Sequence, residues 1–192
     1  MTVTHDTPTA ILDVAERLVQ QRGFNGFSYA DVAGELGVTN AALHYHFPGK
    51  AELGEALMTR YAARFAAALS EIDARTDDAA DKLDAYAALY ADVLGARRMC
   101  LCGMLAAEYD TLPPPMQAVV LGFFDENEHW LERVLEDGRR SGTLIVAEPA
   151  RDAARLIVSA LEGAMLVARP YADVGRFNTA ARALLATLAR PV

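Results

Sequence analysis

Residues 26–53 read GFSYADVAGELGVTNAALHYHFPGKAEL, and this stretch decides how the N-terminal part of the chain folds. Ser28 stands three positions before an acidic residue, which is a capping-box pattern that opens a helix. Gly37 can adopt the left-handed backbone conformation of the residue that ends a helix. Thr39 can cap a second short helix, which Pro48-Gly49 ends because proline disfavours helix at the residue before it. Two short helices joined by a turn that contains glycine predict a helix-turn-helix.

The composition predicts an all-α fold. About half of the 192 residues are hydrophobic (53%), alanine is frequent, and no alternating strand pattern stands out. The N-terminus lacks the pattern of a secretory signal, and the longest apolar run, residues 156–168, is too short to cross a bilayer. Cys100 and Cys102 are too few for a disulfide framework. We therefore expect a cytoplasmic protein without membrane contact.

Helical spacing, caps and breakers predict further helices along the whole chain. A proline in the first turn opens the first of them, and Pro170 and Gly175 separate the last two. A short apolar segment at residues 99–109 precedes the rigid run Leu112-Pro113-Pro114-Pro115. The predicted helices outside the helix-turn-helix cover residues 7–22, 50–74, 79–96, 116–141, 150–169 and 177–189.

Residues 9–57, and above all the run LHYHFPGK at residues 43–50, resemble the DNA-binding segment of the tetracycline-repressor family of bacterial transcription regulators. The resemblance implies a three-helix head, residues 1–50, and a long helix that leads into a helical domain, residues 51–192. That domain would bind a small-molecule effector and form a homodimer. The implied function is a repressor that leaves a palindromic operator in double-stranded DNA when the effector binds, without catalysis, cofactor or metal.

Candidate DNA contacts lie on and around the second helix of the motif. Asn40 can read a base edge, and Ala41 is small enough to contact a thymine methyl group. Tyr45 matches a family position that commonly reaches the DNA backbone, and Lys50 matches the family's lysine at a phosphate. His44 stands where the family more often has tyrosine. The predicted contacts are Ser28, Thr39, Asn40, Ala41, His44, Tyr45 and Lys50.

The charge opposes a DNA-binding function based on general electrostatics. The chain carries a net charge of −8, and the first 60 residues hold four cations against seven carboxylates. A protein that relied on phosphate attraction would be basic. If the head binds DNA, it must therefore use local donors and specific contacts. The acidic head also favours the alternative of a helical interaction protein without DNA affinity.

The two final helices are apolar on more than one side, and small residues stand between their large apolar residues. Such helices are buried on more than one side, either at the centre of a monomeric bundle or in an interface with a second copy. The family resemblance implies the second arrangement. The predicted interface residues are Leu156, Ala160, Leu161, Gly163, Ala164, Leu184 and Leu188.

The segment at residues 99–108, MCLCGMLAAE, resembles one in a subgroup of the family in which a cysteine senses electrophiles or oxidants. Cys100 is the better match, and Arg97 and Arg98 just before it would stabilise a thiolate. The alternative is that both cysteines are small buried hydrophobes. The predicted pocket for an apolar or aromatic effector comprises Tyr86, Tyr90, Cys100, Met104, Phe123, Phe124, Trp130 and Met165.

An enzymatic function finds little support in the sequence. His44-Tyr45-His46 is the densest group of candidate metal ligands, but residues two apart on a helix do not face one site. No carboxylate or cysteine joins these histidines at ligand spacing. We therefore predict no metal centre and no catalytic set.

Overall fold

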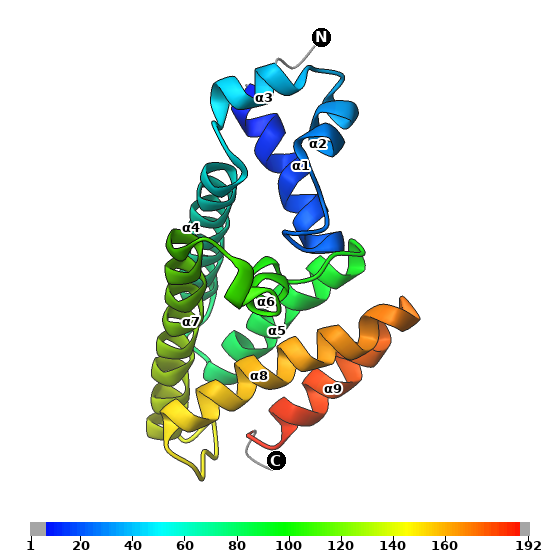
Figure 1. The fold of residues 1–192 in the computed structure, drawn as a ribbon. Helices are drawn as coiled ribbons and strands as arrows, with labels where there is room; N and C mark the ends of the chain where they lie inside the picture. Colours follow the sequence, from blue (N-terminus) through cyan, green and yellow to red (C-terminus); the bar gives the residue numbers. More distant parts are fainter. Residues whose placement is uncertain (1–6, 189–192) are drawn as a thin grey trace. The chain divides into compact units, whose positions relative to one another are not determined.

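The computed structural model describes residues 7–188, and all of the regular elements in that range are helices (Figure 1). The expected all-α fold is therefore confirmed. None of these helices is long and apolar enough to cross a membrane. The elements are α1 (Thr7–Arg22), α2 (Tyr29–Leu36), α3 (Asn40–His46), α4 (Lys50–Arg75), α5 (Ala79–Gly95), α6 (Leu101–Ala106), η1 (Tyr109–Thr111), α7 (Pro114–Ser141), α8 (Ala150–Ala168), η2 (Arg169–Tyr171) and α9 (Val174–Ala186).

The observed boundaries follow the predicted ones closely, with two differences of a few residues. α7 begins at Pro114, two residues earlier than expected, because proline is well suited to the first turn of a helix. α9 begins at Val174 rather than at residue 177, because Asp173 caps it by accepting the N–H of Gly175 at 2.8 Å. It ends at Ala186, whereas the predicted end at residue 189 lies outside the described residues.

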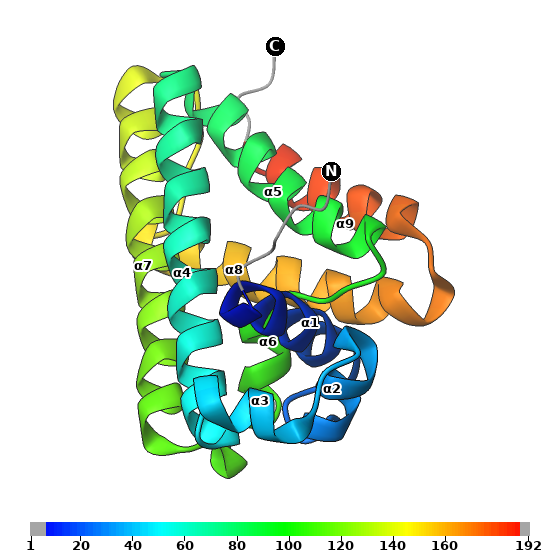
Figure 2. The ribbon, with the colours of Figure 1, turned by 90° about the horizontal axis from the view of Figure 1, so that it is seen from above.

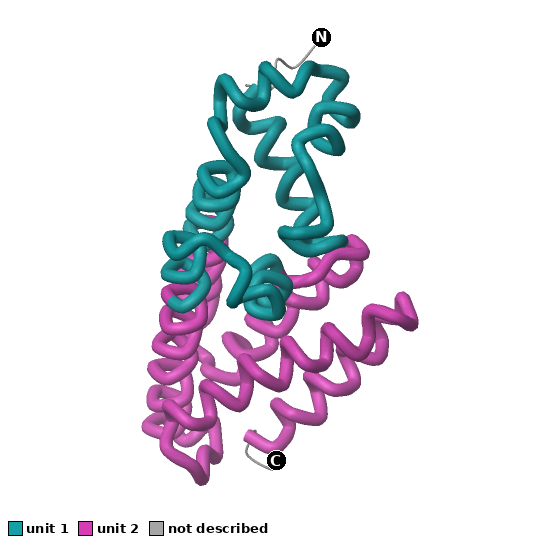
Figure 3. Tube along the Cα trace, viewed as in Figure 1, with its two compact units in different colours: residues 1–63, 101–121 teal, residues 64–100, 122–192 magenta. Residues whose placement is uncertain are grey.

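The chain forms two compact units, which Figure 3 shows in different colours. Unit 1 comprises residues 1–63 and 101–121, and unit 2 comprises residues 64–100 and 122–192. The helix-turn-helix therefore shares its unit with α6 and the start of α7. α4 and α7 each continue from one unit into the other. The expected functional division at residues 50 and 51 stays a prediction.

Unit 1 is built on α1, which packs against both α2 and α6. Its core residues Ile11 and Leu18 are fully buried, as are Val32 of α2 and Leu43 of α3. Each lies on the apolar face that helical spacing predicts. The start of α4 comes very close to its neighbours at Gly54, where an added Cβ would lie within 3 Å of side-chain atoms from α7 and the turn after α1.

In unit 2, α8 and α9 lie side by side, and α5 packs against both of them (Figures 1 and 2). Figure 2 also shows the later part of α4 running alongside α7. Phe177 of α9 and Met165 of α8 are buried at 1% and 0% exposure, so the inner faces of the last two helices belong to the core of their own chain. Their outer faces remain for other contacts.

The two glycines Gly54 and Gly34 allow a matched test of this packing. A Cβ at Gly54 would lie 2.4 Å from Sδ of Met116 and 2.9 Å from the ring of Phe24. Gly54→Ala should therefore lower the free energy of unfolding by about 1–3 kcal/mol. Gly34→Ala meets no atom within 4 Å and should raise it by about 0.5–1 kcal/mol, because alanine favours the helix. Urea unfolding of both variants tests the pair, and a stabilised Gly54→Ala would contradict the described packing.

Candidate functional site

The turn between α2 and α3 has the predicted geometry. Oγ of Ser28 accepts the N–H of Asp31, whose carboxylate accepts the N–H of Ser28 at 2.7 Å. α2 ends at Gly37, whose φ of 67° lies in the left-handed region that favours glycine. Thr39 caps α3 by accepting the N–H of Ala42. These caps are confirmed. The hydroxyl of Ser28, a predicted DNA contact, also donates to the Asp31 carboxylate at 2.6 Å.

One face of α3 is open to solvent. Leu43 is fully buried and attaches the helix to the core of the head, whereas the side chain of Tyr45 is 84% exposed. Its ring touches that of His46 edge-on at 5.1 Å but otherwise faces solvent. The predicted contacts that the structure places together on or beside this exposed face are Thr39, Asn40, Ala41, His44 and Tyr45.

His44 is oriented by the end of α3. Its Nδ1 lies 3.0 Å from the carbonyl of Pro48, and its ring lies 4.7 Å from that of Tyr29. A carbonyl only accepts, so Nδ1 carries the hydrogen and Nε2 of the neutral ring is an acceptor. The Tyr29 hydroxyl lies 2.9 and 2.6 Å from the carbonyl oxygens of Phe47 and Gly49 and shares its single hydrogen between them. Burial, with a smaller effect of a nearby carboxylate, raises the pKa of Tyr29 to about 12, so this hydroxyl keeps its hydrogen.

Lys50 is turned towards the interior of unit 1. Its ammonium donates to the carbonyl of Phe27 and lies 4.8 and 4.3 Å from the ring centroids of Phe24 and Phe27. Burial lowers the pKa of Lys50, while the carboxylates of Glu108 and Asp31 act in the opposite direction. The ammonium would have to leave these partners to reach a phosphate. Its observed role is to hold the turn that leads into α2.

Glu108, which follows α6, holds the preceding turn. Its carboxylate accepts the N–H of Phe24 and, at 3.2 Å, the N–H of Asn25. The side-chain amide of Asn25 donates to Oγ1 of Thr111 at 2.8 Å. Backbone N–H groups in a turn have no partner within a helix and need an acceptor from elsewhere, and Glu108 supplies it here. This contact could not be predicted from sequence patterns, because 83 residues separate Glu108 from Asn25.

The arginines of the head are also engaged within the protein. Each of the three arginines among residues 7–60 lies in at least one ion pair with a carboxylate of unit 1, and Arg60 lies in two. A paired arginine offers less attraction to phosphate, because its field is offset by its partner. The pairs are Arg17 with Glu35, Arg22 with Asp31 at 3.6 Å, and Arg60 with Asp13 at 2.7 Å and Glu16 at 3.0 Å.

Aromatic rings from α4, α5 and α7 meet in the core of unit 2. The rings of Tyr86 and Trp130 stack at 5.6 Å, and Phe65 lies edge-on to Tyr86 and Tyr90 at 6.1 Å and to Phe123 at 5.0 Å. Four of the predicted pocket residues, Tyr86, Tyr90, Phe123 and Trp130, are therefore brought together. Phe65 belongs with them but was not predicted, although its place on the apolar face of α4 was visible in the sequence.

The other predicted pocket residues are distributed differently. Phe124 extends the aromatic cluster, with its ring 5.5 Å from that of Phe123, and Met165 is fully buried on α8. Cys100 is buried in unit 2. Met104 belongs to unit 1, so the predicted set is divided between the two compact units.

A chain of buried hydrogen bonds crosses the aromatic cluster. Nδ2 of Asn127 donates to the carbonyl of Phe123 at 2.7 Å, and its Oδ1 accepts the Tyr86 hydroxyl at 3.0 Å. The Tyr86 oxygen lies 3.0 Å from that of Tyr90. Because the hydrogen of Tyr86 is used on Asn127, Tyr90 must donate to Tyr86, and the remaining capacity of the Tyr90 oxygen is to accept. Burial raises the pKa of both tyrosines, which therefore stay neutral.

Glu162 of α8 is hydrogen-bonded to Cys100 beside these tyrosines. Burial raises the pKa of Glu162 well above its usual value, and the charge and hydrogen bond of Cys100 raise it further. This shift favours the protonated carboxyl, which is the form that can donate to the sulfur. Its Oε1 is fully covered and has no hydrogen-bond partner among the described residues, although part of the side chain remains exposed. Cys100 itself is 2% exposed.

The sequence pointed to arginines as the groups that control Cys100, whereas the partner that the structure reveals is an acid. Arg97 is exposed and has a left-handed φ of 58°. Glu162 and Asn127 are polar residues on helix faces that are otherwise apolar. This interruption of the apolar pattern was the one sequence signal that could have identified them as functional residues. Nothing in the sequence paired Glu162 with Cys100, because that contact depends on how the helices pack.

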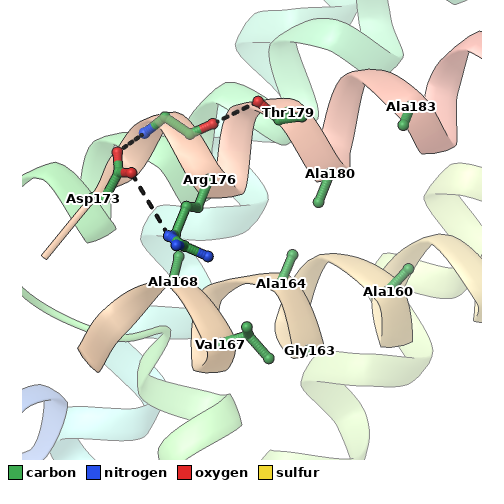
Figure 4. Close-up of a pocket in the computed structure, with 11 residues that line it drawn as sticks. Ala160, Gly163, Ala164, Val167, Ala168, Asp173, Arg176, Thr179, Ala180 and Ala183 are labelled. Carbon is green, nitrogen blue, oxygen red and sulfur yellow. Dashed lines mark hydrogen bonds and ion pairs between the residues drawn. The ribbon is translucent and has the colours of Figure 1, made fainter. Parts of the chain in front are cut away.

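An open surface groove of about 680 Å³ lies between the outer faces of α8 and α9, as Figure 4 shows. Ala160, Gly163 and Ala164 form one wall, and Thr179, Ala180 and Ala183 lie on the other. Three of the predicted interface residues therefore line it. Leu156, also predicted, is 59% exposed on α8. Leu161 is fully buried in the core and supports the groove from behind, and Leu184 and Leu188 are half-buried.

Comparison with known proteins agrees with the helix-turn-helix and with the helical body. Residues 11–57 match the family described as "Bacterial regulatory proteins, tetR family", and residues 79–184 match "Tetracyclin repressor-like, C-terminal domain". These matches define the chain as a bacterial DNA-binding regulator built from an N-terminal helix-turn-helix and a C-terminal helical domain. The chain belongs to the TetR family of transcriptional regulators.

Solved structures share this fold along almost the whole chain. A TetR-family regulator from Agrobacterium tumefaciens is 31% identical with a TM-score of 0.92, over 95% of this chain and 97% of that one. A TetR regulator from Legionella pneumophila is 32% identical with a TM-score of 0.84, over 97% and 100%. The HTH-type regulator TtgR of Pseudomonas putida is 42% identical over 53 residues, which are 28% of this chain and about a quarter (25%) of that relative.

The buried carboxyl of Glu162 should make stability depend on pH. The unfolded chain loses this proton near pH 4.5, whereas the folded protein keeps it to a higher pH. Its contribution to stability is therefore complete below pH 4.5 and declines as the pH rises through the raised pKa. Glu162→Gln removes this decline, so its unfolding free energy relative to wild type should increase from pH 5 to pH 8, by up to about 1.4 kcal/mol per pH unit.

Urea unfolding at pH 5, 6.5 and 8 measures this difference. Glu126→Gln, at an exposed position on the same protein, controls for the loss of one carboxyl group. A difference between Glu162→Gln and wild type that stays constant over this range would show that the folded protein does not hold the Glu162 proton.

Proposed function

We propose that this protein is a ligand-responsive repressor, which binds a palindromic operator as a homodimer in the cytoplasm and leaves it when a small-molecule effector binds. The observation that carries the proposal is the exposed face of α3, which follows a capped α2 and a left-handed turn at Gly37. This is the arrangement in which a recognition helix enters the major groove.

The residues proposed to contact DNA divide by chemistry. Asn40 and Nε2 of His44 can read base edges, and Ala41 can contact a thymine methyl group. Thr39 and the exposed hydroxyl of Tyr45 suit phosphate oxygens. Ser28 and Lys50 complete the proposed set, although both have partners within the protein. Because the arginines of the head are paired, base contacts and neutral donors must supply much of the affinity.

The groove between α8 and α9 supports a homodimer. Alanine and glycine let a second helix pair approach the backbone closely, and exposed apolar side chains surround this small-residue surface. Leu156, Leu166 and Val167 are 59%, 61% and 62% exposed. Burial of these side chains against a second copy would remove apolar surface from water. A two-fold dimer would also present two copies of α3 to the two halves of a palindrome.

The aromatic cluster of unit 2 is the proposed effector site. Tyr86, Phe123 and Trp130 provide apolar rings, and Cys100 provides a nucleophile at the same place. An effector that enters this cluster must separate packed rings, so its binding would change the packing between the helices that carry them. The effector that we propose is an electrophile that alkylates Cys100.

α4 offers a direct connection between effector and DNA contacts, because it is one continuous helix from Lys50 to Arg75. Near its end, Asp73 accepts the indole N–H of Trp130 at 2.9 Å and pairs with Lys82 at 2.7 Å. A change in the aromatic cluster would therefore move the end of α4. We propose that this movement alters the separation of the two heads and breaks their match to the operator.

The DNA contacts can be tested with an operator selected from random duplexes. Asn40→Ala should weaken operator binding by about 1–3 kcal/mol and leave binding to random DNA unchanged. Leu121→Ala, an exposed position on α7, is the control. Wild-type affinity should vary weakly with salt, with a log–log slope near −2 to −4 for about two to four phosphates neutralised per dimer. Fluorescence anisotropy at several salt concentrations measures both quantities.

In the same titration, Lys50→Met tests the proposed phosphate contact while it keeps an apolar side chain beside the phenylalanine rings. If the ammonium reaches phosphate, the slope should become less negative by about two per dimer. An unchanged slope would show that Lys50 makes no phosphate contact and only holds the turn before α2. Equal weakening of operator and random DNA by Asn40→Ala would contradict base reading at that residue.

The dimer interface can be tested at the groove. Ala160→Glu with Ala164→Glu should raise the dimer dissociation constant by about 100-fold or more, because it buries charges without partners. Operator affinity should fall in parallel. Ala67→Glu adds a charge at an exposed alanine of α4 and should change neither. Analytical ultracentrifugation over a range of concentrations measures the dissociation, and a monomeric wild type at micromolar concentration would refute the interface.

A further inference from the structure

Cys100 and Glu162 form a pair whose chemistry goes beyond alkylation of a cysteine. Cys100 immediately precedes α6, and Glu162 lies in the middle of α8. Both belong to unit 2, and their side chains are hydrogen-bonded. Oε1 of Glu162 is covered and has no hydrogen-bond partner among residues 7–188. An acid with a covered, unsatisfied oxygen is costly to keep, and a chemical role for the carboxyl would account for that cost.

We propose that Glu162 donates a proton when Cys100 adds to an activated alkene, so that the pair responds to α,β-unsaturated carbonyl compounds in preference to other alkylating agents. This inference rests on the proposed function, since it assigns the effector class to the same cysteine. It adds a second reacting residue to the site. It also specifies that the electrophile reacts with Cys100 by conjugate addition.

The reaction balances without an oxidant or another reactant. The pair first loses one proton to solvent, which leaves a thiolate that accepts the O–H of the Glu162 carboxyl. The sulfur lone pair forms a bond to the β-carbon, and the π electrons of the alkene move to the α-carbon. The carboxyl proton then passes to that carbon, and the carboxylate regains a proton from solvent. The net change is addition of S–H across the double bond.

The surroundings of the pair favour this role for the carboxyl. Burial raises the pKa of Glu162 and so favours the protonated carboxyl, the form that can give up a proton to the adduct. Tyr86 and Tyr90 of α5 stay neutral, and the hydrogen of Tyr90 is used on Tyr86, so neither is a competing proton donor. On α7, Asn127 accepts the Tyr86 hydroxyl, and the charge of Glu128 acts on Tyr86.

Two probes separate proton donation from simple access to the thiol. N-ethylmaleimide requires a proton at carbon after the sulfur attacks, whereas iodoacetamide loses iodide and requires none. Both probes depend on the same opening of the buried thiol, so the ratio of their rates cancels that step. The experiment uses the full-length protein with Cys102→Ser, so that Cys100 is its only thiol, and follows adduct formation by intact mass.

In that background, Glu162→Gln should slow the maleimide reaction by about tenfold or more and change the iodoacetamide rate much less, because the amide is not an acid. Glu162→Asp should recover part of the maleimide rate. With Glu162 present, the maleimide rate should reach a plateau and fall at high pH as the second proton is lost. In Glu162→Gln it should only rise with pH. The control variant Glu126→Gln should react with both probes at the same rates as the protein that retains Glu162.

Equal slowing of both probes by Glu162→Gln, or no slowing of either, would overturn proton donation by Glu162. Failure of Cys100 to react with maleimide at any pH would overturn it as well. Release from the operator is measured separately on the alkylated protein. If the rate ratio changes as expected but the adduct stays on DNA, the proton transfer stands and the proposed sensing function fails.

Discussion

The geometry of the head depends on one carboxylate. Glu108 accepts the N–H groups of the turn that follows α1, and its charge acts on Lys50, which holds the carbonyl of Phe27 before α2. The entry and the exit of this turn are thereby fixed by two oppositely charged side chains from distant parts of the sequence. Glu108 follows α6, and Cys100 immediately precedes α6. A single short helix therefore separates Cys100 from the residue that secures the DNA-binding head.

The helices of the protein could be predicted because the signals that define them are local. The capping box at Ser28, the left-handed glycine at position 37 and the cap at Thr39 each require only residues within one helical turn. The exposed face of α3 followed from these signals together with helical spacing. The two compact units could not be predicted in the same way. α4 and α7 run through both, so no break in composition marks the boundary near residue 63.

The residues that the sequence did not reveal are those whose roles depend on tertiary contacts. Aromatic residues could be assigned to a core by spacing, whereas Asn127 and Glu162 only interrupt the apolar faces of their helices. Only packing shows that Glu162 meets Cys100 and that Asn127 orders the tyrosine hydroxyls. For the same reason the family resemblance suggested Lys50 as a phosphate contact, whereas its ammonium lies against two aromatic rings of its own unit. The sequence shows the type and charge of each side chain, but which side chain it contacts depends on the tertiary fold.

The internal pairing of the head's arginines has a consequence for how the protein finds its target on a chromosome. Non-specific attachment to DNA is almost entirely electrostatic, and sliding along the duplex depends on it. Arg17, Arg22 and Arg60 are all in ion pairs with carboxylates of the same unit. A regulator with such a head would spend little time on random sequence and would search by diffusion through solution. Few copies would then be held on competing sites, and a small pool of molecules could keep one operator occupied.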